Sequence, residues 1–133
     1  MFFQVIKNMH NMNRVLVVDD DQSILDAMEI ALDLEGYEVE TTTRGQETFS
    51  KIYSFKPDLI LMDVYLSGMD GREICKQIKE DDNTKNIPVI IFSANRSMKE
   101  VFKESGANDF IGKPFNMDEL YEKVKNQTSH ILY

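Results

Sequence analysis

The stretch Leu59-Ile60-Leu61-Met62-Asp63 places a carboxylate at the end of a short apolar run. Pro57 and Asp58 precede this run, and a turn-like segment, residues 67–71, follows it. Short apolar runs bounded by turn residues are typical of buried strands. In open α/β sheets, ligand sites lie at the carboxyl ends of the strands. The stretch therefore predicts a buried strand whose terminal acid, Asp63, is the reactive centre.

The rest of the chain repeats a pattern in which a strand is followed by a helix. The first helix is expected to begin at an N-cap, Asp21, and to stop at Gly36, and Asn116 and Glu119 form a capping box that opens the last one. This alternation predicts an α/β fold with a parallel sheet that helices cover on both faces. The expected strands are 14–18, 37–42, 59–63, 88–92 and 110–112, and the helices between the first and the last are 45–54, 72–80 and 98–104.

The position of each strand in the sheet can be estimated from its apolar content. Residues 14–18, 59–63 and 88–92 are continuous apolar runs, which are typical of central strands buried on both faces. Residues 37–42 and 110–112 are more polar or shorter, so we expect them at the edges.

Length and composition limit the possible classes of function. The chain has 133 residues, which predicts one domain, over 14–127, with an extension at 1–13 and a tail at 128–133. The net charge of -8 disfavours direct binding to nucleic acid or to an anionic membrane. No apolar run reaches the length of a membrane span, and no output domain fits after Tyr133. A stand-alone domain is therefore expected.

Cysteine and histidine contribute little to the expected chemistry. Cys75 is the one cysteine, so an intramolecular disulfide is excluded, which favours a reducing, cytoplasmic location. We expect Cys75 to be a buried, unreactive thiol on a helix. His10 and His130 lie in the tails and are expected to be solvated.

Polar residues follow four of the predicted strands at the point where each ends. Asp19 and Asp20 follow the first strand, Asp63 ends the third, Ser93 follows the fourth and Lys113 follows the fifth. In a parallel sheet these ends lie at one edge, and gathered carboxylates require a compensating cation. A hard divalent ion such as Mg²⁺ suits oxygen ligands of this kind. A carboxylate nucleophile, Mg²⁺, a lysine and a hydroxyl together are what phosphoryl transfer to an aspartate requires.

Each of these residues has an ordinary structural interpretation when it is considered alone. Acids after a strand are common helix caps, and Asp21 is assigned that role. A serine or a Lys-Pro pair after a strand is usually part of a turn. Asp58, Asp70 and Asp109 lack a comparable setting and are interpreted as turn and surface acids. The joint appearance of the set at successive strand ends is what favours a functional interpretation.

With these motifs the chain resembles the receiver domains of two-component response regulators. The resemblance covers residues 14–125 and implies a flavodoxin-like fold with strand order 2-1-3-4-5 and five helices. The matching motifs are Val17-Val18-Asp19-Asp20, Asp58-Leu-Ile-Leu-Met-Asp63, Gly68-Met69-Asp70-Gly71, Pro88-Val-Ile-Ile-Phe-Ser93-Ala94, Gly106-Ala107 and Lys113-Pro114-Phe115.

The resemblance also implies a role for each site residue. Asp63 is implied to be the phosphoacceptor, and Asp20 and Asp63 to bind Mg²⁺ together with the backbone carbonyl of Tyr65. Asp19 is implied to help hold the ion. Lys113 is implied to pair with Asp63 and then with the phosphoryl group.

Further implications concern the switch and the partners. Ser93 and Phe110 match the two switch positions, and a cis peptide bond is expected before Pro114. The implied donor is a phosphohistidine on a kinase or phosphotransfer protein, and the implied output is a downstream protein bound by helix 98–104, strand 110–112 and the last helix. One departure stands out, because Ser67 occupies a position where the family usually has proline. Tyr65 and Asn95 are expected to tune the lifetime of the phosphoryl group.

Three rival functions remain to be compared with this one. A Mg²⁺-dependent aspartyl phosphatase is disfavoured because Tyr65 stands where many such enzymes have a general acid. A flavodoxin-like FMN carrier is disfavoured because three acids occupy the loop that would bind phosphate. A receiver-like interaction module that works without phosphorylation stays open. The implied function is not that of a general enzyme, since the chemistry is limited to the domain's own phosphoryl transfer and slow autodephosphorylation.

Overall fold

A computed structural model describes residues 13–94 and 102–128 of the chain. Five parallel strands form a central sheet in the order β2-β1-β3-β6-β7, which confirms the expected order. The strands are β1 (Arg14–Val18), β2 (Glu38–Thr42), β3 (Leu59–Asp63), β6 (Val89–Ser93) and β7 (Asp109–Gly112).

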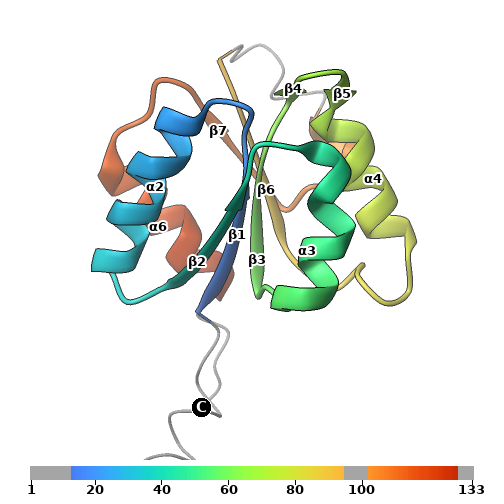
Figure 1. Cartoon of the computed structure of the whole chain (residues 1–133), viewed down its shortest axis with the longest axis horizontal. Helices are drawn as coiled ribbons and strands as arrows, with labels where there is room; N and C mark the ends of the chain where they lie inside the picture. The colour runs from blue at the N-terminus through green and yellow to red at the C-terminus, as the bar shows by residue number, and fades with distance from the viewer. Residues whose placement is uncertain (1–12, 95–101, 129–133) are drawn as a thin grey trace, which may run out of the picture.

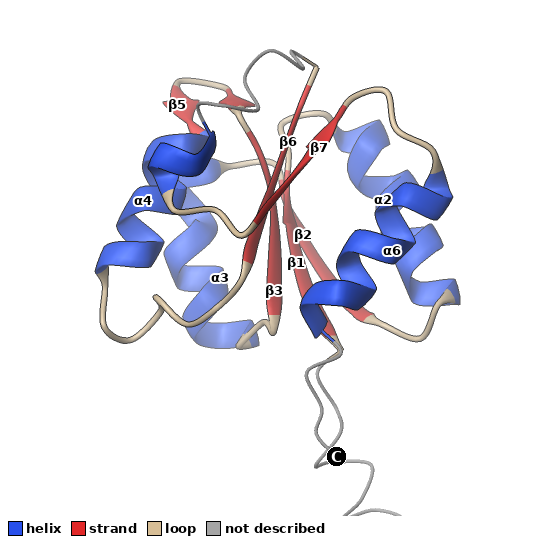
Figure 2. Cartoon of the chain, turned by 180° about the vertical axis from the view of Figure 1, so that it is seen from behind, coloured by secondary structure: helices blue, strands red, loops and turns tan. Residues whose placement is uncertain are grey.

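Helices cover both faces of this sheet, as expected. Figure 1 shows α2 and α6 on one face and α3 and α4 on the other, and Figure 2 shows the same layers from behind. Among the described residues the helices are α2 (Gln22–Leu34), α3 (Thr48–Phe55), α4 (Gly71–Glu80) and α6 (Met117–Thr128), with short 3-10 helices η1 (Gly45–Glu47) and η3 (Lys103–Ser105).

Two apolar clusters form the core, one on each side of the sheet. Along β1, Leu16 and Val18 join the cluster under α3 and α4, whereas Val15 and Val17 join the cluster under α2 and α6. Side chains alternate between the faces of a strand, so a continuous apolar run supplies both clusters. Cys75 is fully buried in the first cluster, as predicted.

The observed boundaries differ from the predicted ones in a few places. The segment predicted as helix 45–54 begins with the 3-10 helix η1 and continues as α3. Of residues 67–71, predicted as a turn, residues 67–68 form the turn of a small antiparallel hairpin in which β4 (Tyr65–Leu66) pairs with β5 (Met69–Asp70), and Gly71 begins α4. Strands of two residues carry too short a pattern to predict. Most of the helix predicted over 98–104 lies outside the described residues.

Local capping explains where two of the helices begin. The carboxylate of Asp21 accepts the backbone N–H of Ser23 at 2.9 Å, which confirms the predicted N-cap of α2. Asn116 accepts the N–H of Glu119 at 2.7 Å at the start of α6.

None of the described helices combines the length and the apolar character that a membrane-spanning helix needs.

Candidate functional site

The carboxyl ends of β1 and β3 bring three acids together. Asp19, Asp20 and Asp63 each place one carboxylate oxygen so that the three oxygens lie within 4.8 Å of one another. β1 and β3 are adjacent and parallel, with Val18 opposite Met62, so their following residues emerge side by side. The sheet register therefore gathers the acids that the sequence predicted to converge.

Lys113 supplies a compensating positive charge to this pocket. Its Nζ lies 3.1 Å from Oδ2 of Asp19 and 3.6 Å from Oδ1 of Asp63. The same ammonium lies 4.8 Å from the centre of the Phe92 ring, which is a cation–π distance. The peptide bond between Lys113 and Pro114 is cis, as expected. Contacts with Asp19, Asp63 and the Phe92 ring together hold the Lys113 ammonium in the pocket.

The three acids differ in environment. Asp19 and Asp63 are buried, whereas Asp20 is exposed. Burial raises the pKa of Asp63 to about 6, and the charge of Asp19 acts in the same direction, while Lys113 opposes the shift. The Asp63 carboxylate is therefore costly to keep ionised without a further cation.

The donor set fits a small, hard cation. Oxygens on opposite sides of a Mg²⁺ ion lie about 4.2 Å apart, because each Mg–O distance is about 2.1 Å. Adjacent ligand oxygens of such an ion lie about 3.0 Å apart, so the oxygens of Asp19, Asp20 and Asp63, which lie within 4.8 Å of one another, would have to move closer together around a bound ion. Three carboxylates facing one lysine also leave negative charge that a divalent ion would neutralise.

Ser93 and Phe110 lie on the strands next to the acidic pocket. Ser93 is fully buried at the end of β6, and its carbonyl accepts the N–H of Lys113 at 2.7 Å. Phe110 is buried in β7 and stacks on Phe102, with ring centroids 5.5 Å apart. Both residues therefore belong to strands beside the pocket, and Phe110 packs in the core cluster under α3 and α4.

The segment after Asp63 turns sharply, and a glycine makes that turn possible. The N–H of Gly71 bonds the carbonyl of Val64 at 2.8 Å. A Cβ at Gly71 would overlap the carbonyl oxygen of Asp63, so α4 begins against the backbone of Asp63. Tyr65, the residue whose carbonyl was predicted as a ligand, lies in β4 with a side chain that is 58% exposed.

Several structural roles were not identified from the sequence. Asp70, interpreted there as a turn acid, caps α4 by accepting the N–H of Arg72 and also pairs with its guanidinium. The pKa of Asp70 is lowered by this contact with Arg72. The roles of Phe92 and Gly71 follow only from the packing. Asn95 lies outside the described residues.

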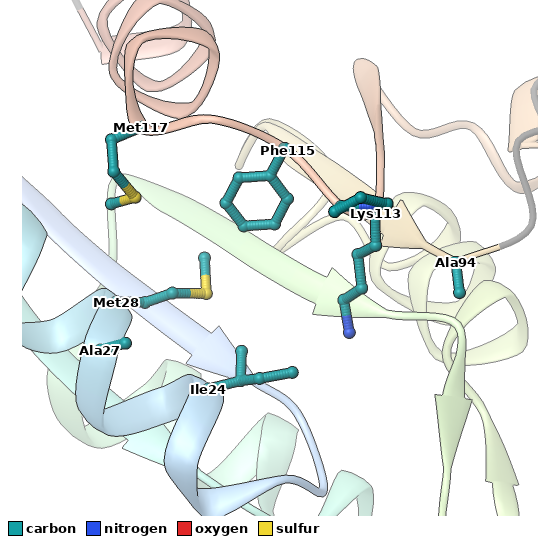
Figure 3. Close-up of a pocket in the computed structure, with 8 residues that line it drawn as sticks. Ile24, Ala27, Met28, Ala94, Lys113, Phe115 and Met117 are labelled. Carbon is teal, nitrogen blue, oxygen red and sulfur yellow. The ribbon is translucent and has the colours of Figure 1, made fainter.

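An apolar groove lies beside the acidic pocket. It has a volume of about 550 Å³, and Figure 3 shows Ile24 and Met28 of α2 on one wall and Phe115 and Met117 on the other. Lys113 borders the groove as well as the pocket. A molecule that filled the groove would thus contact the lysine that pairs with Asp19 and Asp63.

A parallel α/β sheet with an acidic pocket at the carboxyl ends of its central strands defines a known class of domain. The response regulator receiver domain family matches residues 15–125, and the chain belongs to this family.

Individual relatives agree with this assignment. A DNA-binding transcriptional regulator, RpaA of Synechocystis, is 33% identical over 116 residues, which cover 86% of this chain and 48% of RpaA. The chain therefore spans about half the length of that relative. A receiver domain protein of Methanospirillum hungatei is 33% identical, with a TM-score of 0.81 over 89% of this chain and 94% of that one.

A third comparison concerns the metal. The receiver domain of the sensor histidine kinase PA1611 of Pseudomonas aeruginosa is 27% identical to this chain, with a TM-score of 0.79. The match covers 87% of this chain and 97% of that one. That crystal structure holds a magnesium ion in the active site cleft.

Proposed function

We propose that this domain is a signalling switch in which Asp63 accepts a phosphoryl group in a Mg²⁺-dependent reaction. The observation that carries the proposal is the convergence of Asp19, Asp20 and Asp63, with Lys113 as the facing cation. Mg²⁺ would be held by these three acids and by the backbone carbonyl of Tyr65. The bound ion would neutralise charge on the phosphoryl oxygens.

The phosphoryl donor is proposed to be a phosphohistidine on a kinase or a phosphotransfer protein. In the transfer, the P–N bond of the donor breaks and an O–P bond forms at a carboxylate oxygen of Asp63. The imidazole leaves and takes a proton from solvent. Lys113, which lies 3.6 Å from Asp63, would stabilise the charge on the transferred group.

Phosphorylated Asp63 would then change the positions of Ser93 and Phe110. The phosphoryl group adds charge and acceptor oxygens beside β6, and the hydroxyl of Ser93 would donate to one of them. Ser93 pairs with Gly112 in the sheet, and Phe110 lies in the same strand as Gly112. A shift of Ser93 would therefore bias β7 and the ring contact between Phe110 and Phe102.

The output is proposed to be binding of a downstream protein. The surface would consist of β7, α6 and the helix expected over 98–104, with residues 14–127 as the working domain between an extension and a tail. Neither direct DNA binding nor membrane insertion is part of the proposal, and the reducing cytoplasm is the proposed location. Catalysis would be limited to the domain's own phosphoryl transfer and slow autodephosphorylation.

Intact-mass measurement tests this function. The protein is incubated with acetyl phosphate and Mg²⁺, and a mass increase of one phosphoryl group is expected. The increase should disappear in Asp63→Asn and after chelation of Mg²⁺, and it should persist in Asp26→Asn, which alters an exposed acid of α2. An adduct that is undiminished in Asp63→Asn would contradict the proposal. Absence of any adduct in the wild-type protein would favour an interaction module that works without phosphorylation.

A further inference from the structure

A hydroxyl from the β4–β5 hairpin contacts the acidic pocket. Oγ of Ser67 lies 3.1 Å from Oδ2 of Asp20, and the two residues are 47 positions apart in the sequence. Ser67 itself is exposed, as is Asp20. The contact therefore links the turn of the hairpin to the most accessible carboxylate of the three.

Asp20 differs from the other two acids in what holds it. Asp19 is fully buried and its carboxylate accepts both the N–H of Asp21 at 2.9 Å and the ammonium of Lys113. Asp63 is buried and lies within reach of the same lysine. Asp20 is exposed and lacks the ion pair with Lys113 that Asp19 and Asp63 make. Its orientation therefore depends on contacts such as the one from Ser67.

The hairpin holds the Ser67 hydroxyl at a defined place. Leu66 pairs with Met69 on either side of the turn, and Gly68 within it has φ of 75°, a conformation that glycine adopts at little cost. Gly71 bonds Val64 at the base of the hairpin. The turn is thus fastened to the same backbone segment that carries Asp63.

We propose that Ser67 is a positioning residue for the cation site, acting through Asp20. An exposed carboxylate samples several rotamers, and ordering it on metal binding costs conformational entropy. A hydroxyl that already donates to one oxygen reduces this cost and leaves the other oxygen available to the ion. Loss of a group that hydrogen-bonds to a metal-ligating side chain typically changes metal affinity by about 10- to 100-fold. Because Ser67 and Asp20 are exposed, we expect an effect at or below the low end of that range.

The test is calorimetric titration with MgCl₂ in the absence of phosphodonor, and it rests on the proposed Mg²⁺ site. Ser67→Ala should raise the Kd by roughly 3- to 10-fold. Ser67→Thr keeps a hydroxyl and should restore most of the affinity. Ser67→Pro should bind as weakly as Ser67→Ala, because proline suits the first central position of such a turn but has no donor.

A matched control and a double variant separate positioning from general damage. Ser23→Ala removes a hydroxyl that donates to the neighbouring Asp21 at 2.6 Å, and it should leave the Kd unchanged. In an Asp20→Asn background, Ser67→Ala should have no further effect on the Kd. Thermal unfolding with chelator should show that every variant is folded.

The outcomes distinguish this inference from the proposed function. Failure of the wild-type protein to bind Mg²⁺, or an unchanged Kd in Asp20→Asn, would overturn both. A weakened Asp20→Asn together with an unchanged Ser67→Ala would overturn the role of Ser67 alone. An effect of Ser67→Ala that persists in full in the Asp20→Asn background would also overturn it, because Ser67 would then act by another route.

Discussion

Lys113 lies nearer to Asp19 than to Asp63, with Nζ–Oδ distances of 3.1 Å and 3.6 Å. The lysine therefore ties the end of β7 to the end of β1 while keeping contact with the acid at the end of β3. In this position it offsets part of the repulsion among the carboxylates, and it competes with any cation that binds them.

This competition predicts opposite effects of Lys113→Met on two measurements. Removal of the ammonium should tighten Mg²⁺ binding by roughly tenfold, because a nearby like charge is lost. Phosphorylation by acetyl phosphate should slow by roughly 100-fold, because a group that stabilises the transferred charge is lost. Calorimetry and intact-mass kinetics measure the two effects.

Lys123→Met provides the control for charge. Lys123 pairs with Asp109 at 3.0 Å on β7 and α6, away from the acidic pocket, so both quantities should stay at their wild-type values. Weaker Mg²⁺ binding in Lys113→Met would contradict the competition described above.

The raised pKa of Asp63 predicts a specific dependence of stability on pH. Its pKa is 3.8 in an unfolded chain and about 6 in the metal-free fold, so between these values the native state holds a proton that the unfolded state has released. The contribution of Asp63 to stability therefore falls as pH rises from about 4 to about 6 and stays low above that range. The full difference is about 3 kcal/mol.

Urea unfolding with chelator measures this effect. The Asp63→Asn variant should be more stable than the wild-type protein at about pH 7.5, and the difference should shrink toward about pH 4. Added Mg²⁺ should stabilise the wild-type protein at the higher pH and reduce the advantage of the variant. A variant that is less stable than the wild-type protein at about pH 7.5 without metal would contradict the assignment.

Most of the strands could be predicted because their sequence signals are local. The apolar runs that became β1 and β3 were predicted with the observed boundaries, since the neighbouring acids and Pro57 mark their ends. Burial on both faces explains why those runs show no polar alternation. The strand order could not be predicted in this way. It was correct because it came from the family resemblance and not from any local pattern.

Part of the site could not be predicted from the sequence for a physical reason. The convergence of Asp19, Asp20 and Asp63 followed from the rule that parallel strands end at one edge. The contact between Ser67 and Asp20 joins side chains 47 positions apart and depends on the position of a hairpin that was not predicted. Packing of this kind has no periodic signature in the chain.

The close approach of α4 to the backbone of Asp63 predicts a severe effect of Gly71→Ala. The added Cβ would overlap the carbonyl oxygen of Asp63, and backbone atoms cannot move aside without disturbing β3. We expect a loss of about 3 kcal/mol in the free energy of unfolding. Denaturant unfolding measures it.

Gly36→Ala is the matched control for this substitution. Gly36 has φ of 95° and no atom within 4 Å of its added Cβ, so only backbone strain of about 1 kcal/mol is expected. Equal losses in the two variants would show that the overlap with Asp63 is not what constrains residue 71.

The position of the exposed Tyr65 side chain predicts that it prolongs the lifetime of a phosphoryl group on Asp63. Tyr65 lies two residues after Asp63 and is bulky enough to hinder an attacking water. Tyr65→Asn should therefore lose the adduct several-fold faster after the donor is removed. Tyr53→Asn, which changes a similarly exposed tyrosine on α3, should decay at the wild-type rate. An unchanged or slower decay in Tyr65→Asn would count against shielding.

The most direct measurement of the central claim is chemical mapping of the phosphorylated residue. Borohydride reduces an aspartyl phosphate to homoserine, so peptide sequencing by mass spectrometry identifies the acid that carried the phosphoryl group. After treatment with acetyl phosphate and Mg²⁺, we predict homoserine at residue 63 and none in the sample with chelator. Homoserine at another aspartate, with residue 63 unchanged, would contradict the account.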